Sequence, residues 1–461
     1  MKTLIKDGTI VRSDRSFKGS VLIDGEKIAR IYEGDAPDEN AFDTVVDASG
    51  KLVFPGFIDA HTHFDLHVAG TVTIDDFYSG TRAAIAGGTT TIIDFGTQYH
   101  GETLMQGLQN WKEMASAGTS CDYGIHMTIT EWNEEVCREC ETMMEEGVST
   151  FKLYMTYDTR VDDDVFYKVL KRLKEVHGIT GVHCENDGLI AALRDEYASD
   201  SRVSKVSSHY LTRPPEAEAE AVNRLLYIAE QADVPVIVVH LTNELALQEI
   251  RAARKRGRKV FAETCPQYLL LTDDVYELPG FEGAKYVCAP PIRKRSDVEA
   301  LWEALKNGEI QTVSTDHCSF TTEQKRLGTE DFRKIPGGVP GVETRVPLIY
   351  TEGVSKGRIS REDMCRALSE NPARLYGLYP QKGVIQEGAD ADIVILDPDV
   401  KRVISAETQV SKSDYAPFEG YECACAVEKV YLRGTLSAED GKVVCENRGK
   451  FLKRNGYGET I

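Results

Sequence analysis

The middle of the chain alternates between short apolar runs and longer segments in which charged residues are frequent. This alternation is typical of repeated βα units, in which a buried parallel strand is followed by a helix. Eight apolar runs occur in order, at 56–63, 89–95, 122–129, 150–157, 178–186, 234–243, 259–269 and 311–320. Because eight parallel strands with intervening helices close into a barrel, we predict a (β/α)8 barrel over residues 52–377.

Both ends of the chain have a different pattern, in which strand-like runs are separated by turn dipeptides. The N-terminal runs TLIKDGTIV and SVLIDGEKIARIYEG contain Asp7-Gly8 and Asp24-Gly25, which are typical of hairpins. The C-terminal runs GVIQEGADADIVILDPD and AVEKVYLRGTLSAEDGKVV repeat this pattern. We therefore expect one small β domain assembled from residues 1–51 and 378–461.

Polar residues follow the ends of several predicted strands, where the active sites of such barrels lie. His61 and His63 end the first strand, and both imidazoles point the same way because alternate residues of a strand share a face. His183, His240 and Asp316 end the fifth, sixth and eighth strands. For any one histidine, a satisfied core residue is as good an interpretation as a ligand. The shared placement of all of them favours a metal site.

The fourth predicted strand carries a lysine, Lys152, among Phe151, Leu153 and Met155. A buried ammonium ion without a partner is costly, so such a group loses its proton or finds a partner. Four histidines and one aspartate exceed the three protein ligands of a catalytic zinc site, and two cations need anionic bridges. A neutral lysine can add carbon dioxide to form a carbamate with one oxygen for each metal. The alternative is a Lys152 side chain that reaches solvent or pairs with Asp158.

Composition narrows the class of partner. The 461 residues include 74 acidic and 54 basic side chains, a formal net charge of -20, and no run of basic residues. Nucleic acid and anionic membranes are therefore unsuitable partners. The start of the chain lacks the apolar stretch of a signal peptide, and no apolar window of about twenty residues occurs, so we expect a cytoplasmic protein. The eleven cysteines fit reduced thiols, and Cys137 and Cys140 lack the second pair that a structural zinc site needs.

Seven motifs in order resemble the hydantoinase and dihydropyrimidinase branch of the cyclic amidohydrolases: PGFIDAHTHFD, GGTTTIIDF, FKLYMTYD, ETCPQYLLL, APPIR, STDHCSF and GVPGVETR. The similarity covers nearly the whole chain. It implies a distorted (β/α)8 TIM barrel with a small β-sandwich built from both termini. It also implies hydrolysis of the ring amide of dihydropyrimidines or of 5-substituted hydantoins, aryl-substituted ones included, to N-carbamoyl amino acids.

The resemblance further implies two divalent metal ions, zinc in the first place and manganese or cobalt as alternatives. The ligands of the first ion would be His61, His63, carboxylated Lys152 and Asp316, and those of the second would be carboxylated Lys152, His183 and His240. A water that bridges two cations is already hydroxide near neutral pH and can attack a ring carbonyl. The reaction is therefore expected to begin with this attack.

Three further roles follow from the resemblance. Tyr157 would hydrogen-bond the attacked carbonyl, and Asp316 would move a proton from the attacking water to the departing nitrogen. Main-chain groups near Ala289 and Gly337 would hold the ring amide, although the family usually has serine and often asparagine at these positions. The alternative for Tyr157 is a packed aromatic at a strand end. The family is usually tetrameric, so a homotetramer, or else a homodimer, is the expected assembly.

The loop FDLHVAGTVTIDDF lacks the Met-Pro-Phe that dihydropyrimidinases have after the first strand, which leaves the ring substituent and its stereochemistry open. His67 in this loop is interpreted as a surface residue. Asp65 stands where dihydroorotases place an arginine for a carboxylate, which argues against an anionic substrate. An allantoinase stays an alternative. A non-catalytic scaffold related to dihydropyrimidinases is disfavoured, because every ligand position is filled.

Overall fold

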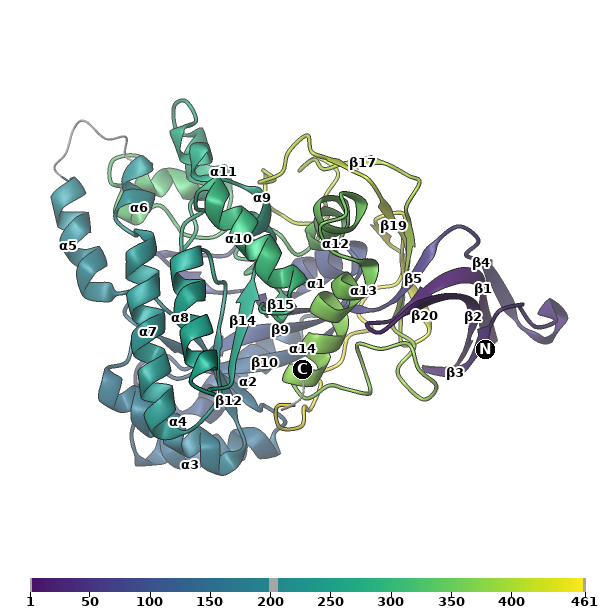
Figure 1. The fold of residues 1–461 in the computed structure, drawn as a ribbon, viewed down its shortest axis with the longest axis horizontal. Coiled ribbons are helices and arrows are strands. Elements are labelled where there is room, and N and C mark those ends of the chain that lie inside the picture. Colours follow the sequence, from purple (N-terminus) through teal and green to yellow (C-terminus); the bar gives the residue numbers. More distant parts are fainter. Residues whose placement is uncertain (1, 199–205, 459–461) are drawn as a thin grey trace.

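An eight-stranded parallel sheet forms the barrel in the computed structural model, which describes residues 2–198 and 206–458. Its order is β15-β14-β13-β12-β11-β10-β9-β6, so strands that follow one another in the chain lie side by side (Figure 1). The strands are β6 (Phe57–Thr62), β9 (Thr89–Thr97), β10 (Asp122–Thr128), β11 (Thr150–Tyr154), β12 (Ile179–His183), β13 (Val236–Val238), β14 (Val260–Thr264) and β15 (Thr312–Val313). All eight predicted strands are confirmed.

The barrel closes between its first strand and the segment that follows its last. β15 has only two residues, and backbone hydrogen bonds of His317 bridge the gap beyond it. The amide of His63 donates to the carbonyl of His317 at 2.8 Å, and the amide of His317 donates to the carbonyl of His61 at 3.3 Å. This closure brings Asp316 beside the two histidines of the first strand.

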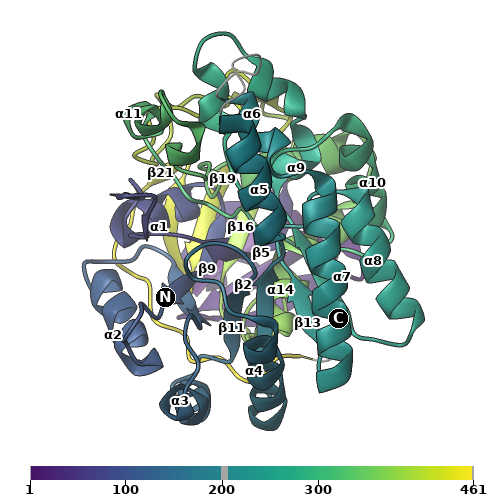
Figure 2. The same ribbon diagram turned by 90° about the vertical axis from the view of Figure 1, so that its left-hand side faces the viewer.

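Amphipathic helices surround the sheet (Figure 2). In α2, a capping box of Thr103 and Gln106 begins the helix, and Leu104, Leu108 and Trp111 are buried on one face. The longer helices are α1 (Phe77–Ala86), α2 (Leu104–Ala115), α3 (Glu134–Glu145), α4 (Asp163–Val176), α5 (Asp187–Ala198), α7 (Pro215–Ala232), α8 (Glu244–Lys255) and α10 (Arg295–Lys306). The shorter helices are α6 (Ser207–Leu211), α9 (Pro266–Leu270), α11 (Thr322–Lys325), α12 (Arg345–Ile349), α13 (Arg361–Cys365) and α14 (Asn371–Leu375). Within residues 2–198 and 206–458, no helix combines the length and apolar character that crossing a membrane requires.

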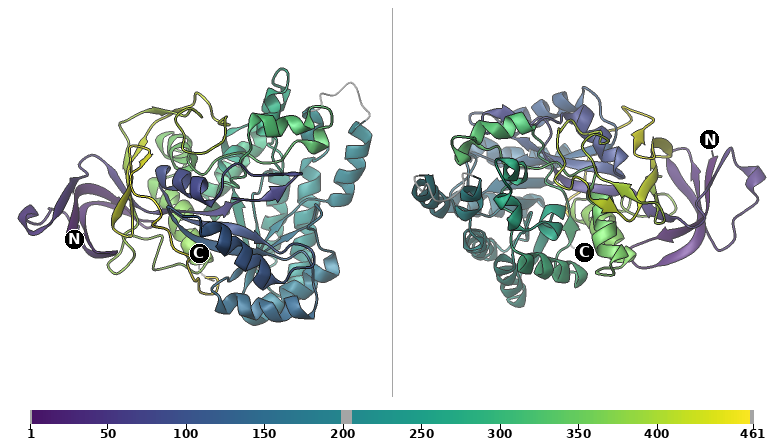
Figure 3. Two further views of the ribbon diagram at one scale, coloured as in Figure 1. Left: turned by 180° about the vertical axis from the view of Figure 1, so that it is seen from behind. Right: turned by 90° about the horizontal axis from the view of Figure 1, so that it is seen from above.

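The two ends of the chain form a second sheet of nine strands. Its order is β21-β20-β19-β16-β5-β1-β2-β3, with β4 paired to β1, and C-terminal β16 is hydrogen-bonded to N-terminal β5. The purple N-terminal strands and the yellow C-terminal strands lie next to each other (Figure 3). The strands are β1 (Lys2–Val11), β2 (Ser16–Asp24), β3 (Lys27–Glu33), β4 (Thr44–Asp47), β5 (Leu52–Pro55), β16 (Ile393–Asp397), β19 (Ala426–Leu432), β20 (Thr435–Glu439) and β21 (Lys442–Val443). Two small ribbons pair β7 (His67–Val68) with β8 (Thr71–Val72) and β17 (Arg402–Val403) with β18 (Glu422–Cys423). One β domain built from both termini is confirmed, and its division from the barrel at 51/52 and 377/378 stays a prediction.

The C-terminal tail covers the amino ends of the barrel strands. The amide of Tyr123 in β10 donates to the carbonyl of Lys450 at 3.0 Å, and the amide of Leu452 donates back to the carbonyl of Tyr123 at 2.8 Å. An apolar layer fills the neighbouring interior, and it includes Ile58, Ile93, Ile179, Ile237 and Tyr376. Because this end is packed shut, the barrel opens at the carboxyl ends of its strands.

Candidate active site

A cavity of about 530 Å³ opens at the carboxyl ends of the barrel strands. Its wall contains the nine residues to which the sequence analysis assigned a metal-binding, catalytic or substrate-binding role, namely His61, His63, Lys152, Tyr157, His183, His240, Ala289, Asp316 and Gly337. The metal-ligand candidates lie on β6, β11 and β12 or just beyond β6, β13 and β15. The parallel register of the sheet therefore brings them to one place.

Histidine nitrogens and one carboxylate form a compact group on the cavity wall. The candidate ligand atoms of His61, His240 and Asp316 all lie within 4.8 Å of one another. Oδ1 of Asp316 lies 3.1 Å from Nε2 of His61 and 3.1 Å from Nε2 of His63. The imidazole of His183 lies 4.6 Å, centroid to centroid, from that of His240. The five side chains therefore form one continuous cluster.

The donor atoms of this cluster fit a divalent metal. Nε2 of His61, Nδ1 of His63 and Nδ1 of His240 are buried and make no hydrogen bond within the described residues. Burial lowers the pKa of His63 to about 4 and the pKa of His240 well below its usual range, so both imidazoles are neutral. Burial by itself would raise the pKa of Asp316, but the neighbouring His61 and His63 hold this pKa well below its usual range. Neutral imidazoles and an ionised carboxylate are the ligands that zinc and similar cations accept.

Lys152 lies beside this cluster with its side chain inside the barrel. It is 1% exposed, so the alternative in which it reaches solvent is wrong. Its Nζ lies 4.6 Å from the ring centroid of Phe95 and 5.0 Å from that of Tyr154, and no ion pair joins it to Asp158 or to another described residue. Burial lowers the pKa of Lys152 to about 8. About a tenth of the amine is therefore neutral and nucleophilic at pH 7.

Tyr157 stands over the cluster in a left-handed backbone conformation, with a φ of 72°. Its ring centroid lies 5.1 Å from that of His183, and the guanidinium carbon of Arg213 lies 5.3 Å from the same ring. Burial raises the pKa of Tyr157, so its hydroxyl keeps its proton and can donate a hydrogen bond. His240 and Asp316 also have positive φ, of 40° and 54°. Such strained backbone is concentrated at functional sites.

Two buried carboxylates behind the histidines were not identified from the sequence. Glu185 bonds Nε2 of His183 at 2.8 Å and forms an ion pair with Arg213, which leaves Nδ1 of His183 as its free ligand atom. Glu263 stands behind His61 in the same way. The sequence does contain a signal for these two acids, because each is a charged residue in or directly after an apolar run, as Lys152 is.

Ala289 and Gly337 form another part of the wall. A Cβ added at Gly337 would meet no atom within 4 Å, so glycine leaves open space where a side chain would project. His67 is exposed, as interpreted from the sequence, and it also lines the cavity. The loop after the first strand therefore contributes to the pocket through a surface residue.

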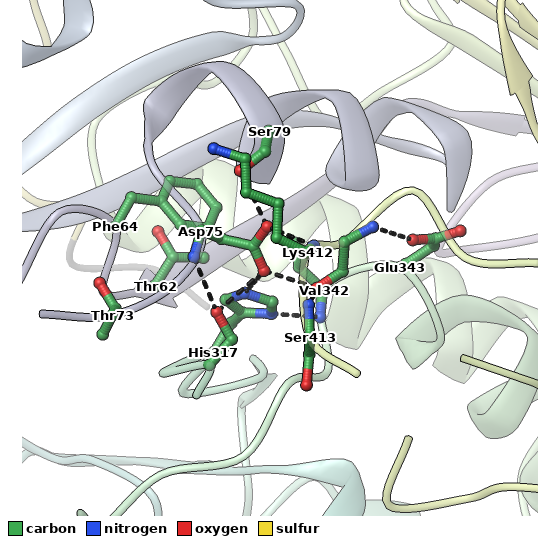
Figure 4. A network of polar contacts seen from close by, with 12 residues as sticks. Thr62, Phe64, Thr73, Asp75, Ser79, His317, Val342, Glu343, Lys412 and Ser413 are labelled. Atoms are coloured by element: carbon green, nitrogen blue, oxygen red, sulfur yellow. Dashed lines mark hydrogen bonds and ion pairs between the residues drawn. The ribbon is translucent and has the colours of Figure 1, made fainter. Parts of the chain in front are cut away.

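A buried network surrounds His317, the neighbour of the aspartate in the cluster (Figure 4). Its Nε2 lies 3.1 Å from Oδ2 of Asp75, and its Nδ1 accepts hydrogen bonds from the amides of Gly341 and Val342 at 3.0 and 3.2 Å. Asp75 also accepts a hydrogen bond from the amide of Lys412 at 2.9 Å. The network thus ties the C-terminal part of the chain to the segment that carries the aspartate. No motif indicated it, because its members lie far apart in the sequence.

Known proteins resemble this chain over its full length. Residues 52–444 match the amidohydrolase family. The D-hydantoinase of Geobacillus stearothermophilus is 44% identical over 100% of this chain and 98% of its own length, and that of Ralstonia pickettii is 40% identical over 99% and 100%. The crystal structure of dihydropyrimidinase from Brevibacillus agri NCHU1002 has 41% sequence identity and a TM-score of 0.96, with 100% of both chains covered. The chain therefore belongs to the amidohydrolase family, in its hydantoinase and dihydropyrimidinase branch.

Proposed function

We propose that this chain is a metal-dependent cyclic amidohydrolase that opens the ring amide of 5-substituted hydantoins, with dihydropyrimidines as its second class of substrate. The products are N-carbamoyl amino acids. The observation that carries the proposal is the cavity in which four histidines, Lys152 and Asp316 converge. The names of the two D-hydantoinases support a hydantoin of D configuration over allantoin. A filled ligand set opposes the scaffold alternative.

The family generally depends on a binuclear metal centre, and the histidine and aspartate cluster agrees with this. We assign His61, His63 and Asp316 to one ion and His183 and His240 to the other, with zinc as the metal. Bound there, the ions would lower the pKa of a coordinated water and polarise the attacked carbonyl.

Lys152 supplies the bridge that the cluster otherwise lacks. Two dications carry four positive charges, and Asp316 contributes a single negative charge. The neutral Nζ of Lys152 attacks the carbon of carbon dioxide, a new N–C bond forms, and one amine proton leaves. The resulting carbamate has one negative charge and two oxygens. The lowered pKa of the Lys152 amine makes its reaction with carbon dioxide accessible near neutral pH.

The remaining residues orient the ring and move the proton. The Tyr157 hydroxyl donates to the carbonyl oxygen, which becomes negatively charged as the carbonyl is attacked. Asp316 accepts a proton from the attacking water and returns it to the ring nitrogen as the C–N bond breaks. Main-chain groups at Ala289 and Gly337 hold the ring amide. Assembly as a homotetramer in the cytoplasm completes the proposal.

The test is a set of initial rates on one preparation whose metal content has been measured. The substrates are the D and L forms of 5-phenylhydantoin, hydantoin, dihydrouracil and allantoin. We expect two metal ions per chain, the highest rate on the D-hydantoin, and a lower rate on dihydrouracil. A highest rate on allantoin, or no hydrolysis of any ring by protein with two metals bound, contradicts the proposal.

A further inference from the structure

Lys325, the last residue of α11, holds three backbone carbonyls with one buried ammonium group. Its side chain is 1% exposed. Nζ donates to the carbonyl oxygen of Val287 at 2.9 Å, to that of Pro336 at 2.7 Å and to that of Gly338 at 2.7 Å. No carboxylate forms an ion pair with it among residues 2–198 and 206–458. Burial lowers the pKa of Lys325 to about 7. Three carbonyl oxygens each need an N–H donor, and only the protonated amine has three, so these contacts favour the ammonium form and use all of its donors.

These carbonyls flank the two main-chain positions on the cavity wall. Pro336 and Gly338 stand on either side of Gly337, and Val287 is two residues before Ala289. The amide of Gly338 also donates to the carbonyl of Val287 at 2.9 Å, which joins the two segments directly. The ammonium therefore fixes a first segment, residues 287–290, and a second segment, residues 336–338, relative to each other.

Other side chains occupy the carbonyls on either side of Ala289. Nε2 of His209 donates to the carbonyl of Cys288 at 2.8 Å, and the hydroxyl of Tyr268 donates to the carbonyl of Pro290 at 2.7 Å. Within the described residues, neither the amide nor the carbonyl of Ala289 forms a hydrogen bond. The peptide groups at Ala289 are thus left for a molecule in the cavity.

In the second segment, too, bonded carbonyls flank a free peptide group. The carbonyls on both sides of Gly337 bind the ammonium group, whereas the amide of Gly337 forms no hydrogen bond within the described residues. We propose that Lys325 is a positioning residue, which clamps these two segments so that the free peptide groups of Ala289 and Gly337 meet the ring amide of the substrate. The inference rests on the proposed function, because it assigns that substrate to the free groups.

The experiment compares Lys325→Met with Arg326→Met, which removes the exposed cation next to it in the chain. In Lys325→Met the KM for the ring substrate rises about tenfold, because hydrogen bonds to the ring amide are lost from misplaced peptide groups. The kcat stays within about threefold of the wild-type value, since the lost contacts are made in ground state and transition state alike. Arg326→Met behaves as the wild type.

A second readout separates positioning of the ring from damage to the metal site. Acetohydroxamate binds metal ions without a ring amide, so its inhibition constant and the metal content stay unchanged in Lys325→Met. A KM within about twofold of the wild-type value in the folded variant overturns the proposal. A higher KM accompanied by metal loss or by weaker acetohydroxamate inhibition also overturns it.

Lys325→Gln covers the case in which Lys325→Met does not fold, because the amide retains a donor for one or two of the carbonyls. Its KM lies between that of the wild type and that of a variant without any of the three hydrogen bonds. The same inhibitor comparison applies. Hydrogen exchange of the Gly338 amide is measured in the same variant and becomes faster. Should the wild type open no ring, the proposed function fails, and unchanged exchange of this amide separately refutes the clamp.

Discussion

Nδ1 of His61 lies 2.6 Å from Oε1 of Glu263, so the carboxylate selects the tautomer of His61 that presents Nε2 to the cavity. Ser314 holds the other carboxylate oxygen, donating at 2.8 Å. Partners of this kind orient metal ligands and raise their basicity. In Glu263→Gln we therefore expect metal affinity to fall by about 10- to 100-fold. Equilibrium dialysis against graded chelator, followed by metal analysis, measures the change.

Glu244→Gln is the matched control, because Glu244 is exposed at the start of α8. It removes one negative charge from the same domain without touching the cavity. Metal retention equal to the wild type in Glu263→Gln would show that His61 is oriented by other contacts.

Removal of the Lys152 amine tests the bridge. In Lys152→Ala we expect loss of both metal ions and of hydrolysis, because the cluster then lacks one bridging charge. Lys168→Ala, on the exposed face of α4, serves as the control and keeps both. Elemental analysis and rates on one sample give the answer. Two tightly bound metals in Lys152→Ala would remove the carbamate from the proposal.

The barrel strands were predictable because each is a short apolar run of its own. The run around Val236–Val238, for example, is buried on both faces and contains His240 just after the strand, so its pattern needs no knowledge of its neighbours. The closure of the barrel was not predictable in this way. It depends on the pairing of His63 with His317, which are distant in the sequence, and β15 is too short to give a pattern.

The residues of the site also divide into those that could be predicted from the sequence and those that could not. His61, Lys152 and Asp316 were found because residues at strand ends of a barrel meet at one face. Lys325 was not found, because its role depends on three carbonyls from two distant segments. Glu263 carried a signal as a charge within a buried run, but its partner is known only once the strands are placed.

Tyr157→Phe separates turnover from metal binding. The change removes the hydroxyl and retains the ring, which keeps its contacts with His183 and Arg213. We expect normal metal content and a kcat lower by about 10²- to 10³-fold, the usual effect of losing one donor to a developing oxyanion. Unchanged kcat would favour the packed aromatic that the sequence left as the alternative.

A half-buried glutamate gives the stability of the fold a pH dependence. The Glu343 carboxylate accepts hydrogen bonds from the amides of Val410 and Ser411 at 2.8 and 3.2 Å, and burial raises its pKa to about 8. Between the ordinary glutamate pKa and about 8, the folded state therefore binds more protons at this group than the unfolded state does. The free energy of unfolding accordingly falls as pH rises through this interval.

Glu343→Gln cannot titrate, so it removes this contribution. Relative to the wild type, the variant should gain on the order of 1 to 2 kcal/mol between about pH 5.5 and pH 8, with allowance for the partial exposure of the side chain. Thermal unfolding of both proteins at these two pH values measures the difference, and metal loss at acid pH affects both equally. Melting temperatures that stay parallel across the interval would mean that Glu343 remains ionised throughout, held by the two amides of the C-terminal segment.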